Sequence, residues 1–180
     1  MADMLVKLYA LPDAGPLLER LARQSIHIRR AEPGESRTIG RWVETHFSES
    51  LAAEVVWAIA REPISCYIAV ERAAPAQSGD AYAKVPRETL IGAACFDAAG
   101  KGLFGPLGVD PAYRKRGVGR ALLLAALEAM RAERYAYAVI GWAGEPEFYR
   151  KVAQATEIAD SEPGIFGVRL AAGDPEAGGP

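Results

Sequence analysis

The chain has 180 residues, half of them apolar and 24% charged, with a formal net charge of −2. Such a length and composition are those of one globular domain with a hydrophobic core of its own. A net charge near zero gives no general attraction to nucleic acid or to a membrane surface, and no apolar run reaches the roughly 18 residues of a membrane span. The sequence therefore predicts a protein that binds neither nucleic acid nor membrane.

Cysteine usage and the N-terminus bear on metal binding and location. Cys66 and Cys95 fall in expected strands, and with two histidines far apart they make no zinc-ligand pattern. The N-terminus lacks the apolar stretch and small-residue cleavage site of a signal peptide. We therefore expect buried thiols, no metal and a cytoplasmic location.

The first 25 residues are expected to form an extension that precedes the main domain. Residues 4–11 suit a short strand, and residues 16–24 suit a helix with proline in its first turn. This extension is compatible with packing on a sheet edge and with pairing of two copies of the chain, so a homodimer is one expected arrangement.

Hydrophobic periodicity predicts the following elements, in chain order. Strands are expected at residues 26–30, 65–71, 90–96, 103–109, 135–140, 156–158 and 165–170. Helices are expected at residues 35–47, 50–61, 118–133 and from 147 onward. The helix from residue 118 is apolar except for Arg120, Glu128 and Arg131 on one side, which predicts burial against a sheet. Residues 72–87 read as a long hairpin loop, and residues 171–180 have the composition of a disordered tail.

The most informative segment runs from Leu107 to Leu122, with the sequence LGVDPAYRKRGVGRAL. It combines a strand end, a glycine-bearing turn and a helix start, where free backbone N–H groups and the helix dipole attract an anion. Basic residues are disfavoured in a first helical turn, yet Arg114, Lys115, Arg116 and Arg120 surround this one. A bound pyrophosphate accounts for them.

The sequence does not match the patterns of two common nucleotide-binding loops. A Walker A loop needs Ser or Thr after Gly-Lys, but Gly100-Lys101 is followed by Gly102. A Rossmann fingerprint needs a third glycine where this chain has Leu122. The remaining pattern is R-x-x-G-x-G, formed by Arg114, Gly117 and Gly119.

That pattern resembles motif A of the GNAT acetyltransferase superfamily. Val109-Asp-Pro111 precedes it, and an apolar helix, a strand and Glu147-Phe-Tyr149 follow in the family's order. The resemblance covers roughly residues 26–170 and leaves residues 1–25 and 171–180 as an extension and a tail. It implies an α/β (α+β) fold, with a twisted, mixed, mostly antiparallel sheet of about six to seven strands. Helices flank this sheet, and a splayed strand pair forms the cofactor cleft.

The resemblance implies acetyl-CoA as cosubstrate and no metal. The basic turn would take the pyrophosphate, and the pantetheine arm would lie beside the strand at residues 103–109, where Gly105 and Pro106 suit a bend. A backbone N–H there would polarise the thioester. Lys115 departs from the family, many of whose members have glycine at that position. The implied cofactor-binding residues are Leu107, Gly108, Val109, Arg114, Lys115, Arg116, Gly117, Val118, Gly119, Arg120 and Phe148.

The resemblance also implies acetyl transfer to a primary amine by direct attack in a ternary complex. Tyr149 stands where many members place the general acid that protonates the CoA thiolate, although packing against Phe148 is another interpretation. Residues 103–109 contain no carboxylate, so the general base stays open between Asp97, Glu49 and Glu147. Further candidates near the acceptor side are Glu54, His46, Trp42, Trp57 and Trp142.

The acceptor is a small-molecule amine or a protein amine, and fold-level analogy does not choose between them. Two alternatives to an enzyme remain: a non-catalytic module that binds or senses acyl-CoA, and a domain for another anionic ligand such as a nucleotide. Tyr149 and the bent strand favour an enzyme over a non-catalytic module, whereas the absence of both nucleotide-binding patterns counts against a nucleotide-binding domain.

Overall fold

The computed structural model describes residues 1–74 and 87–166. The strands are β1 (Met4–Lys7), β2 (Ile26–Arg30), β3 (Cys66–Arg72), β4 (Glu88–Phe96), β5 (Leu103–Val109), β6 (Tyr137–Ile140) and β7 (Thr156–Glu157). The helices are α1 (Gly15–Ala22), α2 (Ser36–His46), α3 (Glu49–Ala60), α4 (Val118–Ala132) and α5 (Pro146–Ala153). Short 3-10 turns are η1 (Leu8–Ala10), η2 (Pro33–Glu35) and η4 (Pro111–Tyr113).

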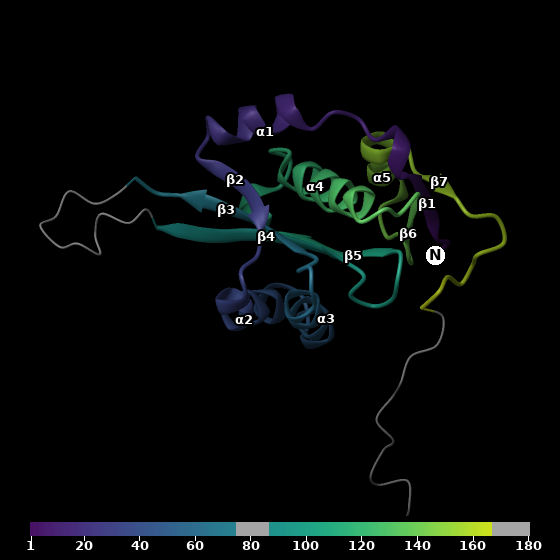
Figure 1. Cartoon of the computed structure of the whole chain (residues 1–180), viewed down its shortest axis with the longest axis horizontal. Helices are drawn as coiled ribbons and strands as arrows, with labels where there is room; N and C mark the ends of the chain where they lie inside the picture. Colours follow the sequence, from purple (N-terminus) through teal and green to yellow (C-terminus); the bar gives the residue numbers. More distant parts are fainter. Residues whose placement is uncertain (75–86, 167–180) are drawn as a thin grey trace, which may run out of the picture.

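One seven-stranded sheet, in the order β2-β3-β4-β5-β6-β1-β7, separates two layers of helices. Helices α1, α4 and α5 lie on one face, and α2 and α3 lie on the other (Figure 1). Every neighbouring pair of strands is antiparallel except β5 and β6, which are parallel. The expected fold class, a mixed and mostly antiparallel sheet flanked by helices, is therefore confirmed.

The N-terminal strand β1 lies inside the sheet rather than on its edge. Met4–Lys7 pairs with Tyr137–Ile140 of β6, and the other side of β1 pairs with β7. Met4, Val6 and Leu8 are buried in the main core. The first residues of the chain are thus part of the same packed unit as the remainder.

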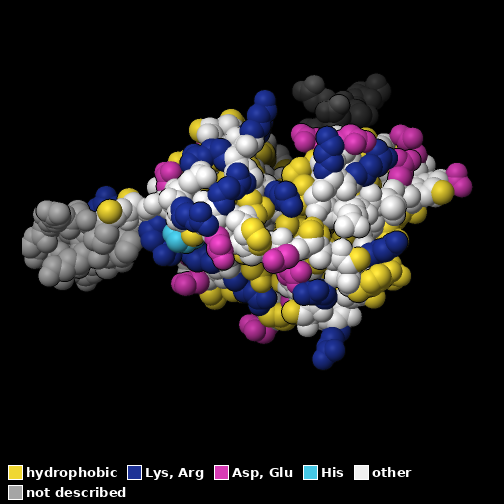
Figure 2. All heavy atoms as spheres, turned by 90° about the horizontal axis from the view of Figure 1, so that it is seen from above, with side chains coloured by type: hydrophobic (Ala, Val, Ile, Leu, Met, Phe, Trp, Pro, Cys, Tyr) yellow, Lys and Arg dark blue, Asp and Glu magenta, His cyan; other side chains and the backbone are white. Residues whose placement is uncertain are grey.

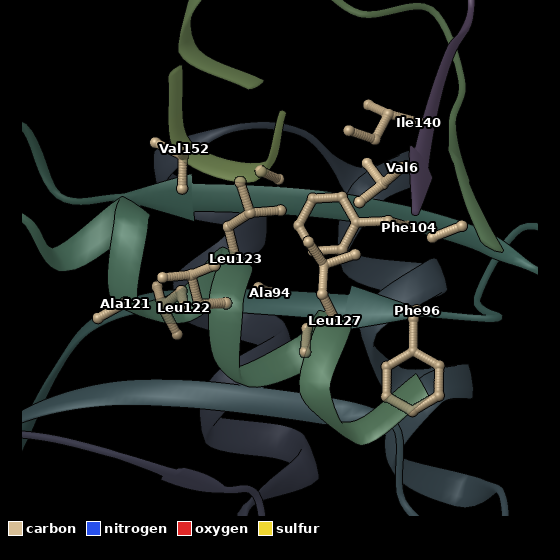
Figure 3. Packing of buried hydrophobic residues seen from close by; sticks show 14 of the residues in the cluster. Val6, Ala94, Phe96, Phe104, Ala121, Leu122, Leu123, Leu127, Ile140 and Val152 are labelled. Atoms are coloured by element: carbon tan, nitrogen blue, oxygen red, sulfur yellow. The ribbon is translucent and has the colours of Figure 1, made fainter. Parts of the chain in front are cut away.

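The main core lies between α4 and the sheet. Leu122, Leu123, Leu124 and Leu127 of α4 are fully buried, and each contributes about 1.5–3 kcal/mol by leaving water. Figure 3 shows Leu123 and Leu127 pointing toward Phe104 of β5 and the neighbouring strand residues. The solvent side of α4 carries the Glu128–Arg131 ion pair, as its sequence predicts. A second cluster joins α2 and α3 to the opposite face of β3 and β4.

Several expected strands have other bounds in the structure. The strand expected at residues 4–11 ends at Lys7, and Leu8–Ala10 form η1 instead. Strand β6 begins at Tyr137 instead of residue 135, because the backbone N–H of Tyr135 donates to the carbonyl oxygen of Met130 at 3.1 Å, in the turn that ends α4. Ile165 and Phe166 form no strand, since the N–H of Ile165 donates to the carboxylate of Asp3 at 2.9 Å. Residues 167–170, the tail and most of the 72–87 loop lie outside the described residues.

Membrane-spanning helices and clustered metal ligands are absent from the described residues. No helix within residues 1–74 and 87–166 combines the length and the apolar character needed to cross a bilayer. In the same ranges, no three His, Cys, Asp or Glu side chains gather as a metal site.

Candidate functional site

The site begins where β5 and β6 part. These parallel strands pair only through Leu103 with Val139 and Phe104 with Ile140. The next residue, Gly105, has φ 136, a backbone conformation that residues with a side chain rarely adopt. Glycine thus allows β5 to turn away from β6 while it stays paired with β4, and this produces the splayed strand pair.

The unpaired edge of β5 offers backbone groups of Leu107 and Val109. On the other edge, the N–H of Asp110 donates to the carbonyl oxygen of Ile91 at 2.9 Å. Because the backbone groups of successive strand residues point to alternate edges, those of Leu107 and Val109 point away from β4. In agreement, Nε of Arg114 donates to the outward carbonyl oxygen of Val109 at 3.3 Å.

Beyond β5 the chain makes the basic turn, residues 114–120. Asp110 fixes its entry by accepting the N–H of Ala112 at 2.8 Å. Lys115 and Gly117 both take left-handed conformations, with φ 60 and φ 97. A side chain in that conformation costs roughly 1–2 kcal/mol, so Lys115 is tolerated here at some loss of stability. Helix α4 then begins at Val118 without a side-chain cap or an acidic residue in its first turn. Its first N–H groups therefore remain available to an anion.

Aromatic rings connect the basic turn with the point where the strands part. A Cβ on Gly119 would lie 3.5 Å from Val109 and 3.8 Å from Phe148, so glycine leaves a narrow space between them. The ring of Phe148 contacts that of Tyr149 at 5.1 Å between centroids, and Tyr149 contacts Phe104 at 6.4 Å. Burial, together with the charge of Glu145, raises the pKa of Tyr149 to about 12. The Tyr149 hydroxyl therefore keeps its proton at neutral pH.

A cleft of about 700 Å³ opens beside this point. Its walls come from the start of α3, from the first half of β5 and from the chain that follows β6. They include Ser48, Ser50, Leu51, Glu54, Leu103, Phe104, Gly105, Pro106, Gly141, Trp142 and Phe166. The lining is mostly apolar, with two hydroxyls and one carboxylate, which suits a substrate that carries both an apolar body and a cation.

Comparisons with known proteins decide the family. The sequence profile described as "Acetyltransferase (GNAT) family" matches residues 41–153. The chain belongs to the GNAT acetyltransferase family. No curated protein matches it in sequence.

Solved structures show the same GNAT fold at low sequence identity. A glucosamine N-acetyltransferase region of a fungal multi-domain beta-N-acetylglucosaminidase superposes with a TM-score of 0.66 and 13% identity, over 87% of this chain and 19% of that one. A GCN5-related N-acetyltransferase from Sphaerobacter thermophilus gives a TM-score of 0.55 and 19% identity, over 87% of this chain and 48% of that one. The chain thus spans less than half the length of either protein.

Glu54 is the acid that the GNAT fold brings to the cleft. It lies on α3 with Ser50 and Leu51, and it is the single Asp or Glu among the described residues that line the cleft. Burial raises the pKa of the Glu54 carboxyl above its ordinary value. A partly desolvated carboxylate facing a substrate space is suited to accept a proton or to bind an ammonium group.

The three acids that the sequence offers as the general base do not line the cleft. Glu49 is exposed at the start of α3, and Glu147 is exposed and paired with Arg150. Asp97 is buried, and its carboxylate accepts the N–H of Gly102 and the hydroxyl of Tyr135, both at 2.7 Å. None of them is among the described residues that line the cleft.

Of the remaining candidates on the acceptor side, one lines the cleft and the others lie outside its lining. Trp142 lines the cleft, whereas Trp57 is 62% exposed on α3. His46 stacks on Trp42 at 4.5 Å between ring centroids, and its Nε2 lies 3.9 Å from the carboxylate of Asp110. His46 therefore joins the end of α2 to the end of β5.

Asp3 is a site-forming residue that no sequence signal identified. It is 7% exposed, and its two carboxylate oxygens accept the N–H groups of Trp142 at 2.8 Å and Ile165 at 2.9 Å. Its own N–H donates to the hydroxyl of Ser161 at 2.9 Å. Asp3 thus holds the two segments that carry Trp142 and Phe166 into the cleft wall.

Proposed function

We propose that this protein is an acetyl-CoA-dependent N-acetyltransferase that moves an acetyl group to a primary amine by direct attack in a ternary complex. The observation that carries the proposal is the continuity of the site. A series of contacts leads from Gly119 in the basic turn to Phe148, from Phe148 to Tyr149, and from Tyr149 to Phe104. Phe104 lines the same cleft as Glu54.

The donor's chemical groups fit the residues present. The N–H groups of the first turn of α4, with Arg114, Lys115, Arg116 and Arg120, suit a pyrophosphate. The outward backbone groups of Leu107 and Val109 suit the amides of a pantetheine arm, and Gly119 leaves space beside Phe148. Acetyl-CoA would supply an acetyl group activated as a thioester.

Glu54 is the base of the proposed reaction. It faces the cleft from α3, so an acceptor ammonium placed there loses its proton to the Glu54 carboxylate and becomes the free amine that attacks. The apolar part of the lining, including Leu51 and Trp142, holds the body of the acceptor.

Tyr149 is the acid of the proposed reaction. It lies on α5 and is not itself one of the described residues that line the cleft, but its ring contacts Phe104, which does. Because an ordinary thiol has a pKa of about 8.5, a phenol with a pKa of about 12 gives up its proton reluctantly. Tyr149 therefore acts first as a hydrogen-bond donor to the charge that develops on sulfur, and the proton follows as the thiol leaves.

Two paired comparisons test these roles. Turnover with a panel of amines is measured through the amount of CoA released, and affinity for acetyl-CoA is measured by calorimetry. Tyr149→Phe should lower kcat by about 100-fold or more with little change in affinity, whereas Tyr137→Phe, on the exposed part of β6, should change neither. Unchanged turnover in Tyr149→Phe would remove Tyr149 from the mechanism.

The second pair uses one helix. Glu54→Gln should lower kcat/KM for the amine by about 100-fold, whereas Glu49→Gln, exposed on the same α3, should stay near wild type. The opposite pattern would make Glu49 the base. If wild type binds acetyl-CoA but turns over no amine, the protein is an acyl-CoA sensor instead of an enzyme.

The proposal also bears on location. Cys66 and Cys95 are buried free thiols that face each other across β3 and β4. Reduced, unpaired cysteines and a reaction that consumes acetyl-CoA both fit the cytoplasm.

A further inference from the structure

Helix α1 lies against the basic turn, although residues 1–40 fall outside the family match. Leu17 and Leu21 of α1 are buried in the main core with Val118 and Ala121 of α4. A Cβ placed on Gly117 would lie 3.1 Å from Cδ1 of Leu17 and 2.8 Å from Nη2 of Arg20. Because residues three apart lie on one face of a helix, the packing that buries Leu17 also fixes Arg20 over Gly117.

Arg20 has no acidic partner among the described residues. Its side chain makes no hydrogen bond or ion pair within residues 1–74 and 87–166, and Glu19, its neighbour on α1, faces Arg23 at 3.7 Å. The acids near the turn are engaged as well. Glu71 accepts the hydroxyl of Tyr113 at 2.6 Å, and Asp110 accepts the N–H of Ala112.

The cations around the turn have few other contacts. Arg116 lies over the ring of Tyr113 at 5.0 Å and donates weakly to Gln24 at 3.4 Å, while Arg114 binds the carbonyl oxygen of Val109. Lys and Arg side chains gather over α1 and the start of α4 in Figure 2. Gathering like charges costs free energy that a bound anion would offset.

We infer that Arg20 is a phosphate-binding residue of the donor site, supplied by the N-terminal segment and not by the matched family domain. The inference rests on the proposed function, since the phosphates are those of CoA: the pyrophosphate and the 3′-phosphate of its ribose. An arginine guanidinium suits either group, because its planar fork can donate two hydrogen bonds to one phosphate. The N-terminal segment is then part of the donor site as well as of the sheet.

The test compares Arg20→Gln with Arg23→Gln. Arg23 is a matched position because it lies three residues further along, at the C-cap of the same helix. The side chain of Arg23 is 77% exposed, and among the described residues its ion-pair partner is Glu19. Affinities for CoA and for dephospho-CoA, which lacks the 3′-phosphate, are measured by calorimetry at low and at moderate salt. Thermal unfolding without ligand checks that both variants fold as wild type does.

Arg20→Gln should weaken CoA binding on the order of 10-fold, and Arg23→Gln should not. A loss for CoA alone places Arg20 on the 3′-phosphate, and an equal loss for both ligands places it on the pyrophosphate; either result supports the inference. Wild-type affinity of Arg20→Gln for both ligands overturns it while leaving the proposed function intact. If wild type binds neither ligand, the proposed function fails as well.

Discussion

Replacement of Asp3 by alanine tests how the N-terminal segment builds the cleft. Asp3 accepts two backbone N–H groups, those of Trp142 and Ile165, and both of its oxygens are used. Alanine leaves both donors without an acceptor at a position that is only 7% exposed.

The expected magnitude follows from these two bonds. Leaving a buried donor unsatisfied costs about 1–3 kcal/mol, and water can replace part of what is lost near the surface. We expect Asp3→Ala to lower the free energy of unfolding by roughly 2–4 kcal/mol. Asp3→Asn keeps one acceptor and should lose about half as much.

Urea unfolding measures the stability change, with Glu44→Ala, an exposed acid on α2, as the control. Steady-state kinetics adds a second readout. Because Trp142 and Phe166 line the cleft, KM for the amine should rise more than KM for acetyl-CoA. An Asp3→Ala variant within about 0.5 kcal/mol of wild type, with an unchanged KM for the amine, would refute this account of the cleft wall.

Three further predictions concern single positions. Burial raises the pKa of the Glu54 carboxyl, so the folded state loses stability as the pH rises through that pKa. The Glu54→Gln variant should therefore unfold at a higher urea concentration than wild type at pH 7.5. The difference between the two proteins should shrink toward pH 4. Gly108→Ala puts a Cβ 2.5 Å from the ring of Phe47 and should lower the free energy of unfolding by about 1–3 kcal/mol. Adding Phe47→Leu should restore part of this loss. Additive losses in the double variant would contradict the contact. Lys115→Gly should raise the free energy of unfolding by about 0.5–1 kcal/mol, because φ 60 suits glycine, and a lower thermal midpoint would count against it.

The proposed donor side of the site could be inferred from the sequence because it is local in the chain. A phosphate cradle needs consecutive N–H groups at one helix start, so Arg114, Gly117 and Gly119 stand within a few residues of one another. The helix that follows is apolar on most faces, which dictates burial against the sheet. Family, fold class and most element boundaries followed from this region and from periodicity.

The acceptor side was not predictable from the sequence, because it depends on which helix face is buried. Glu49 and Glu54 both lie on α3, whose apolar residues surround the helix so that its pattern does not single out a face. Packing against β3 and β4 turns Glu54 toward the cleft and leaves Glu49 in solvent. The choice between two similar acids is thus made by tertiary contacts.

Long-range pairing explains the other differences. Met4 pairs with Ile140, far along the chain, so no local pattern could place β1 between β6 and β7. The same placement brings Asp3 to Ile165 and brings α1, with Arg20, to the basic turn. The contacts of the N-terminal segment with both ends of the proposed site are therefore a property of the folded chain.

Thermal unfolding in the presence of acetyl-CoA, CoA and ATP tests the central claim, that the basic turn and the free edge of β5 form a CoA site. A ligand at about 100 times its Kd adds about 2.7 kcal/mol of stability, which for a chain of this length corresponds to a rise in Tm of roughly 5–10 °C. Such a rise with acetyl-CoA and CoA, and little change with ATP, is the predicted result. An equal rise with ATP, or no rise with either CoA species, would contradict it.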